Sequence, residues 1–235
     1  MITYEQMIEN LKSLKEKGFI KSKRSGDTGI GKTLEDLLGI EENNLPSSNG
    51  VKTELKSARK NGSSMLTLFT KSPLPRGINS KLLSMYGYET VEGTGKKELH
   101  TTVSAINFNQ LRGKPGFKLD IRDDKIYLVP YDKGIEAYWD KETLKRTFER
   151  KLPKILYVKA DTRVQEGNEE FWFNEAWELS GFDFDSFVSL LRQGVILLDI
   201  RIGQYPNGRA HDHGSGFRVP PNKLDLCFSK RVRVV

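Results

Sequence analysis

A glutamate and a lysine stand two residues apart in segment 51–57, VKTELKS. The alternating character of this segment predicts a β-strand, on which Glu54 and Lys56 share one face while Leu55 points to the core. On such a face the carboxylate can bind Mg²⁺, and the lysine can orient or deprotonate a water that attacks a phosphodiester. Exposed strands also carry such pairs by chance, so the spacing alone does not establish a cleavage site.

A second charged pair with the same spacing occurs late in the chain. Asp199 and Arg201 lie in the apolar run 195–202, VILLDIRI, which is expected to be a buried strand, and they share one of its faces. Arginine can bind O6 and N7 of guanine, and aspartate can accept a hydrogen bond from N4 of cytosine. Together they suit one C·G pair, although an ion pair at a strand end explains the same spacing.

The loop after this strand contains two of the chain's three histidines, in the sequence His211-Asp212-His213. Such a cluster can bind zinc, but only His100 remains as a further histidine. A tetrahedral zinc site would therefore need distant carboxylates as ligands.

Residues 26–33, GDTGIGKT, match the Gly-x4-Gly-Lys-Thr pattern of phosphate-binding loops. In NTPases this loop joins a buried parallel strand to a helix whose N-terminus meets the phosphates. Here the preceding residues 21–25, KSKRS, are too polar for a buried strand, and the helix predicted after them, over 33–38, is short. The context therefore disfavours an NTPase.

The composition is that of a basic globular protein. Of 235 residues, 38 are Lys or Arg and 31 are Asp or Glu, which gives a net charge of +7 and favours an anionic partner. The single cysteine, Cys227, excludes an internal disulfide framework. Residues 1–18 lack the apolar core of a signal peptide, so we expect a cytoplasmic protein that does not associate with membranes.

Helices and strands alternate along the chain, which predicts an α/β or α+β fold with a mixed central sheet. No repeat or linker composition divides the sequence, so one domain over residues 1–235 is expected. A capping box, Thr3 with Gln6, predicts a first helix that ends at Gly18. Further helices are predicted over 33–38, 80–86, from Asp140 to about residue 152, and over 184–192; strands are predicted over 51–57, 65–70, 99–106, 117–121, 126–131, 155–159, 171–177 and 195–202.

Five blocks of the sequence resemble one known family. They are TGIGKTLEDLLGIEENNL from residue 28, ELKS from 54, LTLFTKSPLPRG from 66, DIRIGQY from 199 and HDHGSGFRV from 211. In order and length they are similar to the MvaI/BcnI restriction endonucleases, relatives of the mismatch-repair nickase MutH among the PD-(D/E)XK nucleases. The resemblance runs from about residue 19 to about residue 219. It also accounts for the phosphate-loop pattern, because the family has the same segment without being NTPases.

The resemblance implies a PD-(D/E)XK core, a mixed sheet flanked by helices with a DNA-binding cleft. Its catalytic part would span about residues 19–160, and its base-reading part about residues 195–220. By position, the family's catalytic helix glutamate corresponds to Glu35, and its strand glutamate and lysine to Glu54 and Lys56.

The family's metal-binding aspartate corresponds to Asn49, which is a departure. An amide can coordinate Mg²⁺ beside Glu54 but brings no charge, so weaker metal binding and slower cleavage are expected. The chain is then either a variant made to trap uncut DNA or a natural weak or silent homologue. A further alternative is that Asn49-Gly50 is a simple turn and that the role of the aspartate falls to Asp36 or Glu41.

For DNA recognition, the resemblance places Asp199 and Arg201 at a base-reading surface and adds Arg218 as a second guanine-reading candidate. It favours a DNA-facing role for the histidine loop over a zinc site. It also implies that the basic, proline-containing loop 70–77 approaches the other groove or the backbone. The further DNA-binding candidates are His211, Asp212, His213, Lys71 and Arg76.

The activity implied is that of a Mg²⁺-dependent type II restriction enzyme. It would act as a monomer on double-stranded DNA at a short, G·C-flanked, pseudo-palindromic site, with a cognate DNA methyltransferase as its genetic rather than physical partner. The alternatives are a MutH-like strand-specific nickase and a cleavage-silent DNA-binding homologue.

Overall fold

The computed structural model describes residues 2–40, 44–46, 52–91, 93–132, 134–152 and 154–235. The chain divides into two compact units, each built from separate segments. Unit 1 comprises Met1–Ser64, Arg150–Phe182 and Leu224–Val235, and unit 2 comprises Met65–Glu149 and Asp183–Lys223. Sequence composition does not mark this division of the expected single domain, because the chain passes back and forth between the units without a linker. The expected catalytic part, about residues 19–160, contributes to both units.

Helix α1 (Tyr4–Glu16) confirms the predicted capping box. The Thr3 side chain accepts a hydrogen bond from the backbone N–H of Gln6, and the Gln6 side chain accepts one from the N–H of Thr3. These two bonds satisfy donors that a helix start otherwise leaves unpaired. Met7, Leu11 and Leu14 form the buried stripe of the helix.

Helix α2 (Gly29–Leu38) begins earlier than the predicted 33–38, inside the phosphate-loop pattern. The extra turn forms because Ile30, Leu34 and Leu38 make one continuous buried stripe. The strand before it, β1 (Ile20–Lys21), has only two residues and pairs antiparallel at the edge of a sheet. A phosphate-binding loop would need a buried parallel strand there, so the structure agrees with the rejection of an NTPase.

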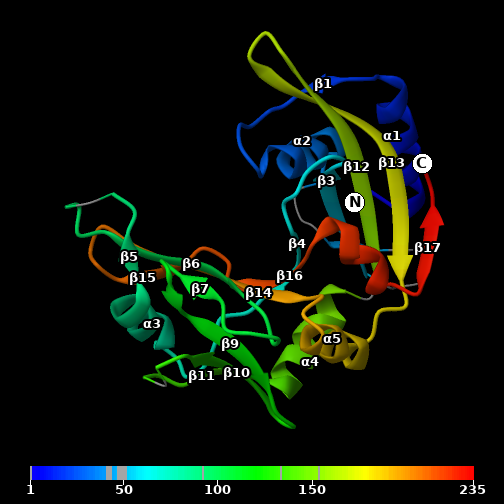
Figure 1. Cartoon of the computed structure of the whole chain (residues 1–235). Helices are drawn as coiled ribbons and strands as arrows, with labels where there is room; N and C mark the ends of the chain where they lie inside the picture. The colour runs from blue at the N-terminus through cyan, green and yellow to red at the C-terminus, as the bar shows by residue number, and fades with distance from the viewer. Residues whose placement is uncertain (1, 41–43, 47–51, 92, 133, 153) are drawn as a thin grey trace. The chain divides into compact units, whose positions relative to one another are not determined.

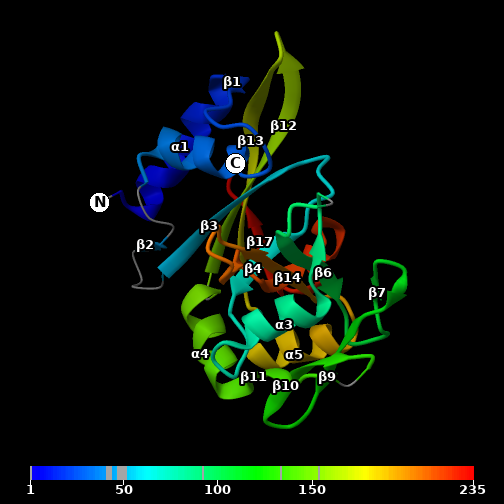
Figure 2. The same cartoon turned by 90° about the vertical axis from the view of Figure 1, so that its left-hand side faces the viewer.

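Unit 1 has one mixed sheet with both of these helices on the same face (Figures 1 and 2). The strand order is β1-β13-β12-β3-β2, with β17 also paired to β13; β3 and β12 run parallel, and the other described pairs run antiparallel. Apolar side chains of β3, β12 and β13 pack against α1 and α2 in a single core. The remaining bounds are β2 (Asn44–Pro46), β3 (Lys52–Arg59), β12 (Lys154–Gln165), β13 (Asn168–Ser180), a 3-10 helix (Pro221–Leu226) and β17 (Lys230–Arg233).

Strands β12 and β13 are longer than the predicted 155–159 and 171–177. They form the long hairpin visible in Figure 1, and its turn places Glu166 (φ 51°) and Gly167 (φ 75°) in the left-handed region. Two such residues give a turn whose twist matches paired strands, so the pairing continues up to the turn.

Unit 2 contains an antiparallel sheet in the order β4-β16-β14-β6-β5, with β15 beside β14. A second antiparallel sheet has the order β11-β10-β9. The strands are β4 (Leu66–Thr70), β5 (Tyr88–Glu89), β6 (Lys97–Val103), β7 (Gln110–Leu111), β8 (Lys114–Pro115), β9 (Phe117–Ile121), β10 (Lys125–Pro130), β11 (Ala137–Asp140), β14 (Leu197–Gln204), β15 (Ala210–Asp212) and β16 (Gly216–Val219); the helices are α3 (Ile78–Tyr86), α4 (Lys141–Lys151), whose last two residues belong to unit 1, and α5 (Phe184–Arg192).

Helices α4 and α5 of unit 2 each start at an aspartate whose side chain caps the first turn. Asp140 accepts a hydrogen bond from the N–H of Thr143 at 2.8 Å, and Asp183 accepts one from the N–H of Ser186 at 2.7 Å. Strand β9 and helix α5 have the predicted bounds. The mixed α+β class is thus confirmed, and no helix in the described part of the chain is long and apolar enough to cross a membrane.

The core of unit 2 is rich in aromatic side chains around Phe217. Its ring lies 5.1 Å from Phe69, 5.2 Å from Phe187 and 5.8 Å from Trp139, measured between ring centroids, and none of its surface is exposed. Such tilted and edge-on contacts add to the stability that area burial provides.

We predict that Phe217→Ala lowers the free energy of unfolding by about 3–5 kcal/mol, because it removes apolar contacts and leaves a cavity. Denaturant titration followed by tryptophan fluorescence measures the loss. Val91→Ala, at a residue of unit 2 that is 63% exposed, is the control and should change stability by less than about 0.5 kcal/mol. Equal stability of the two variants would show that this aromatic cluster does not hold the unit together.

Candidate active site and nucleic-acid interface

Glu54 and Lys56 lie together on β3 in unit 1. The Lys56 Nζ is 3.4 Å from Glu54 Oε1, while Leu55 faces the opposite way into the core below α1 and α2. The parallel pairing places Ile155 of β12 beside Glu54 and Tyr157 beside Lys56. A buried central strand therefore holds the pair, whose side chains are only 10% and 13% exposed.

The carboxylate of Glu54 is incompletely satisfied. Its Oε2 is buried and has no hydrogen-bond partner among the residues that the structure describes, and the nearest described cation is the Nζ of Lys151, 3.9 Å away at the end of α4. A buried carboxylate oxygen without a donor is costly in a folded protein. It has the chemistry of a ligand for a hard divalent cation.

The environment of Lys56 lowers the pKa of its ammonium group. Burial lowers the pKa of this ammonium, the carboxylate of Glu54 opposes that effect, and the positive charge of Lys151 adds to it. A lysine with a lowered pKa can accept a proton or orient a water more readily than an exposed one. Next to it, burial and the carboxylates of Glu175 and Asp225 raise the pKa of Tyr157 to about 12, so its phenol stays protonated at neutral pH.

The other predicted catalytic residues are placed less directly. Glu35 is half-buried on α2, one turn after Gly31, whose Cβ position would lie 3.7 Å from the Ser57 hydroxyl of β3. No hydrogen bond or ion pair between described residues joins Glu35 to Glu54 or Lys56. Asn49 lies outside the described residues. Within the part of the chain that the structure describes, no group of three or more His, Cys, Asp or Glu residues is arranged to hold a metal.

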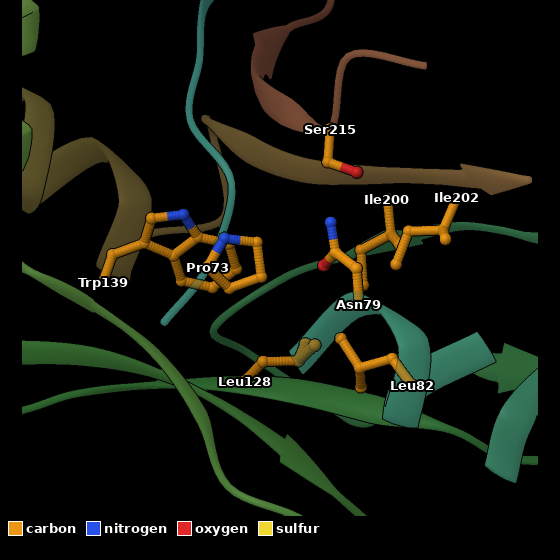
Figure 3. A pocket seen from close by; sticks show the side chains of 8 residues that line it. All are labelled: Pro73, Asn79, Leu82, Leu128, Trp139, Ile200, Ile202 and Ser215. Atoms are coloured by element: carbon orange, nitrogen blue, oxygen red, sulfur yellow. The ribbon is translucent and has the colours of Figure 1, made fainter. Parts of the chain in front are cut away.

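In unit 2 the side chains of β14 alternate between an apolar and a polar face. Ile200 and Ile202 point into a narrow recess that they share with Leu82 of α3 and Leu128 of β10, as Figure 3 shows. The recess is too narrow to hold a water molecule, so it is a packing feature and not a ligand site. Asp199 and Arg201 therefore face the other side of the sheet.

Asp199 binds both predicted guanine-reading arginines. Its Oδ2 lies 2.7 Å from Nε of Arg201 and 2.9 Å from Nε of Arg218, although only the first contact is aligned as a hydrogen bond. Its Oδ1 accepts a hydrogen bond from the Thr102 hydroxyl at 3.1 Å. The Arg201 side chain is 47% exposed, whereas that of Arg218 is only 12% exposed and its Nη2 donates to the carbonyl of Gly214 at 3.4 Å. The paired N–H groups of an arginine match the O6 and N7 acceptors of guanine.

The strand register extends this polar face across the sheet. His100 of β6 pairs with Arg201, and His211 of β15 pairs with Gly203. The ring of His213 lies 4.3 Å from that of His211 and 6.4 Å from that of His100. We call this side of the sheet the polar face; its members are His100, Thr102, Asp199, Arg201, His211, His213 and Arg218.

The remaining DNA-binding candidates lie elsewhere in unit 2. Asp212 pairs with Ile202 and so points to the apolar side of β14, away from the polar face. The backbone of Lys71 is fixed, since its N–H donates to Ser215 O and its carbonyl accepts from the Trp139 indole. Arg76 is exposed.

Comparison with known proteins settles the family. The sequence model of the MvaI/BcnI restriction endonuclease family matches residues 8–228. This chain belongs to the MvaI/BcnI restriction endonuclease family. Two solved structures are similar to it: the complex of restriction endonuclease MvaI with its cognate DNA substrate, at 31% identity and TM-score 0.84 over 98% of each chain, and MvaI in the absence of DNA, at 32% identity and TM-score 0.58 over 100% of this chain and 99% of that one. No curated protein matches by sequence.

Membership confirms the resemblance recognised in the five sequence blocks, and it makes the chain a site-specific deoxyribonuclease of type II. Restriction endonucleases generally use divalent metal ions, which agrees with the unpaired carboxylate oxygen of Glu54.

Sequence reasoning did not predict four residues that the structure places at these two sites. Thr102 and His100 share a face of β6, but nothing local indicates which strand that face adjoins. Gly203 leaves room for the ring of His213, because a Cβ at this position would overlap Nε2 of that histidine. Lys151 reaches Glu54 only through the tertiary fold. Of these four residues, only His100 and Thr102 had a signal in the sequence, namely that their spacing puts them on one face of β6.

We predict that Gly203→Ala displaces the His213 ring and raises its pKa. Partial desolvation, together with the imidazoles of His211 and His100, lowers the pKa of His213, and displacement from these neighbours reverses each effect. Titration of the histidine resonances by NMR measures the change. Gly31→Ala is the control, because its Cβ would make only an ordinary contact. An unchanged His213 titration in Gly203→Ala would contradict the described packing.

Proposed function

We propose that the chain is a Mg²⁺-dependent restriction endonuclease that hydrolyses a phosphodiester with Glu54 and Lys56 and recognises its site with the polar face of unit 2. The observation that carries this proposal is the buried pair on β3 in a member of this family, with one carboxylate oxygen of Glu54 that accepts from no donor among the described residues. A PD-(D/E)XK core with a DNA cleft, a role for Glu35 and a cytoplasmic location stay predictions.

Glu54 would hold the metal through Oε2, and Asn49 would be the second ligand. A bound Mg²⁺ would polarise the phosphate and lower the pKa of a coordinated water. Lys56, with its lowered pKa, would orient the attacking water and take up its proton as the P–O bond to the leaving group breaks. The neutral side chain of Asn49 would weaken metal binding, so the enzyme is expected to need more Mg²⁺ than a homologue with aspartate there.

The recognition part of the proposal depends on preorganised arginines. Arg201 and Arg218 would each bind a guanine through Nη groups, while Asp199 fixes their orientation and Thr102 fixes Asp199. The DNA-bound MvaI structure is the neighbour that supports double-stranded DNA as the ligand. We further propose a monomer, a short G·C-flanked and pseudo-palindromic site, and a cognate methyltransferase as the genetic partner.

Digestion of supercoiled plasmid over a Mg²⁺ titration tests this function against its rivals. Linear product with uniform ends supports the restriction enzyme, and mapping of the ends gives the site. Open-circular product alone would indicate a strand-specific nickase. Plasmid that stays supercoiled at every Mg²⁺ concentration, despite specific binding, would indicate a cleavage-silent homologue.

We predict that Glu54→Gln and Lys56→Met each slow cleavage at least about 10²-fold. The first removes the charge that would bind Mg²⁺, the second removes the amine that would orient the water and take up its proton, and both nearly keep the side-chain volume. Single-turnover rates with saturating enzyme measure the effect, and DNA affinity should change less than about threefold (0.6 kcal/mol). Lys60→Met, four residues further along the same segment, is the matched control. If either active-site variant cuts at the wild-type rate, the cleavage site lies elsewhere.

We also predict that Arg201→Ala and Arg218→Ala each weaken binding to the cleavage site by about 1–3 kcal/mol, and binding to random duplex much less. Fluorescence anisotropy with both duplexes at one fixed salt concentration measures this, since phosphate contacts depend strongly on salt. Arg192→Ala, at an exposed arginine of α5, is the control. Equal losses on the two duplexes would mean that the arginines contact only the DNA backbone.

A further inference from the structure

Asp212 is set apart from its histidine neighbours by the alternation of β15. His211 pairs with Gly203 and Asp212 pairs with Ile202, so their side chains leave opposite faces of the sheet. The ring of His213 lies on the same face as His211, and the centroids of the two rings are 4.3 Å apart. The two histidines thus lie on the polar face, whereas Asp212 lies on the side of α3.

The carboxylate of Asp212 is fully occupied inside the protein. Oδ2 accepts hydrogen bonds from the Ser72 hydroxyl at 2.8 Å and from Nδ2 of Asn79 at 3.2 Å. Oδ1 accepts from the backbone N–H groups of Gly214 at 3.0 Å and Ser215 at 2.6 Å. A carboxylate offers about four acceptor positions, so little capacity remains for a base.

These four donors come from three separate segments. Ser72 belongs to the proline-containing loop 70–77, Asn79 to the first turn of α3, and Gly214 and Ser215 to the loop after β15. Figure 3 shows the Asn79 amide between Pro73 and Ser215, directed from α3 toward the sheet. The carboxylate therefore joins the loop that carries His213 to two elements on the opposite side of the sheet.

The hydrogen bonds also favour the charged carboxylate. Although burial opposes ionisation, the N–H of Ser215 and the hydroxyl of Ser72 lower the pKa of Asp212. Asp212 therefore accepts from all four donors at any pH at which DNA cleavage is measured.

We propose that Asp212 is a positioning residue that, with Ser72 and Asn79, fixes His211 and His213 on the polar face, and that it does not contact a base itself. This assignment rests on the proposed role of the polar face in reading DNA. Asp212, Ser72 and Asn79 together form what we call the loop latch. Its loss would leave the histidines present but no longer held in place, and recognition of the base pairs that they face would weaken.

The test compares single variants of the latch with a control. A duplex is selected by the wild-type protein from a random library, and anisotropy gives its affinity relative to duplexes with one base pair changed. Ser72→Ala and Asn79→Ala are expected to reduce this discrimination at least about threefold, and Asp212→Ala at least about tenfold, by 1.4 kcal/mol or more. Ser80→Ala, at an exposed residue of α3 next to Asn79, should leave it unchanged.

Two further variants separate a latch from a base contact. The double variant Asp212→Ala/Ser72→Ala should discriminate no worse than Asp212→Ala, because both changes break one unit. Asp212→Asn should retain most discrimination, since its carbonyl can accept from Gly214 and Ser215 and its amide can donate to the Ser72 hydroxyl. If the Asn79 amide turns over, the new amide can also donate to Oδ1 of Asn79, which has no partner among the described residues. Wild-type discrimination in both Ser72→Ala and Asn79→Ala, with a large loss in Asp212→Ala, would overturn the proposal and make Asp212 a base reader. A loss in Asp212→Asn as large as that in Asp212→Ala would also overturn it.

Histidine resonances of the DNA-free protein keep this proposal separate from the proposed function. The latch predicts shifted His211 and His213 signals in all three alanine variants and unshifted signals in Ser80→Ala, whether or not DNA is bound. If the wild-type protein selects no sequence, base reading by the polar face fails, while these spectra still decide the role of the latch. If Asp212→Ala does not fold, as seen by thermal denaturation, Ser72→Ala and Asn79→Ala decide it.

Discussion

Side chains on a β-strand alternate between two faces, and both sites of this protein depend on that constraint. On β3 it buries Leu55 against two helices and leaves Glu54 and Lys56 together on the other side. On β14 it directs Ile200 and Ile202 into the core of unit 2 and Asp199 and Arg201 to the polar face. A shift of either strand by one residue would move its apolar side chains to the polar side and its charged side chains into the core. The apolar cores of the units therefore fix the strand register that places the charged residues.

The charged groups lie in surroundings that make an unpaired charge costly. In unit 2 the cost is offset locally, because Asp199 faces two guanidinium groups and accepts a hydrogen bond from Thr102. In unit 1 the cost is not offset in this way, because one oxygen of Glu54 has no donor in the described part of the chain and the nearest described cation to that oxygen is 3.9 Å away. The charges of the polar face are thus paired within unit 2, whereas Glu54 keeps an oxygen that no described residue satisfies.

Sequence reasoning succeeds here where the signal is local. The capping box of Thr3, the start of α4 at Asp140 and the bounds of β9 and α5 each depend on a few neighbouring residues, and the structure agrees with each. The start of α2 and the length of the β12–β13 hairpin were missed, because packing and the turn decide them. Family membership was recoverable, since the motif blocks are long and ordered.

The contacts between distant segments were not recoverable in the same way. The Glu-x-Lys spacing indicates that Glu54 and Lys56 share a face, but no pattern joins Lys151 to Glu54 or Ser72 to Asp212. The sequence motif HDH also suggests three equivalent side chains, whereas the strand register turns the middle one away.

The parallel pairing of β3 with β12 has a consequence for how the enzyme is made. Glu54 pairs in register with Ile155, and the first segment of unit 2 lies between them in the chain. During synthesis β3 therefore leaves the ribosome well before the strand that completes its surroundings, and closing so long a loop is slow. A partly made chain carries Glu54 and Lys56 without the buried environment that lowers the pKa of Lys56. The surroundings of this pair are therefore complete only once β12 has been made and has paired with β3.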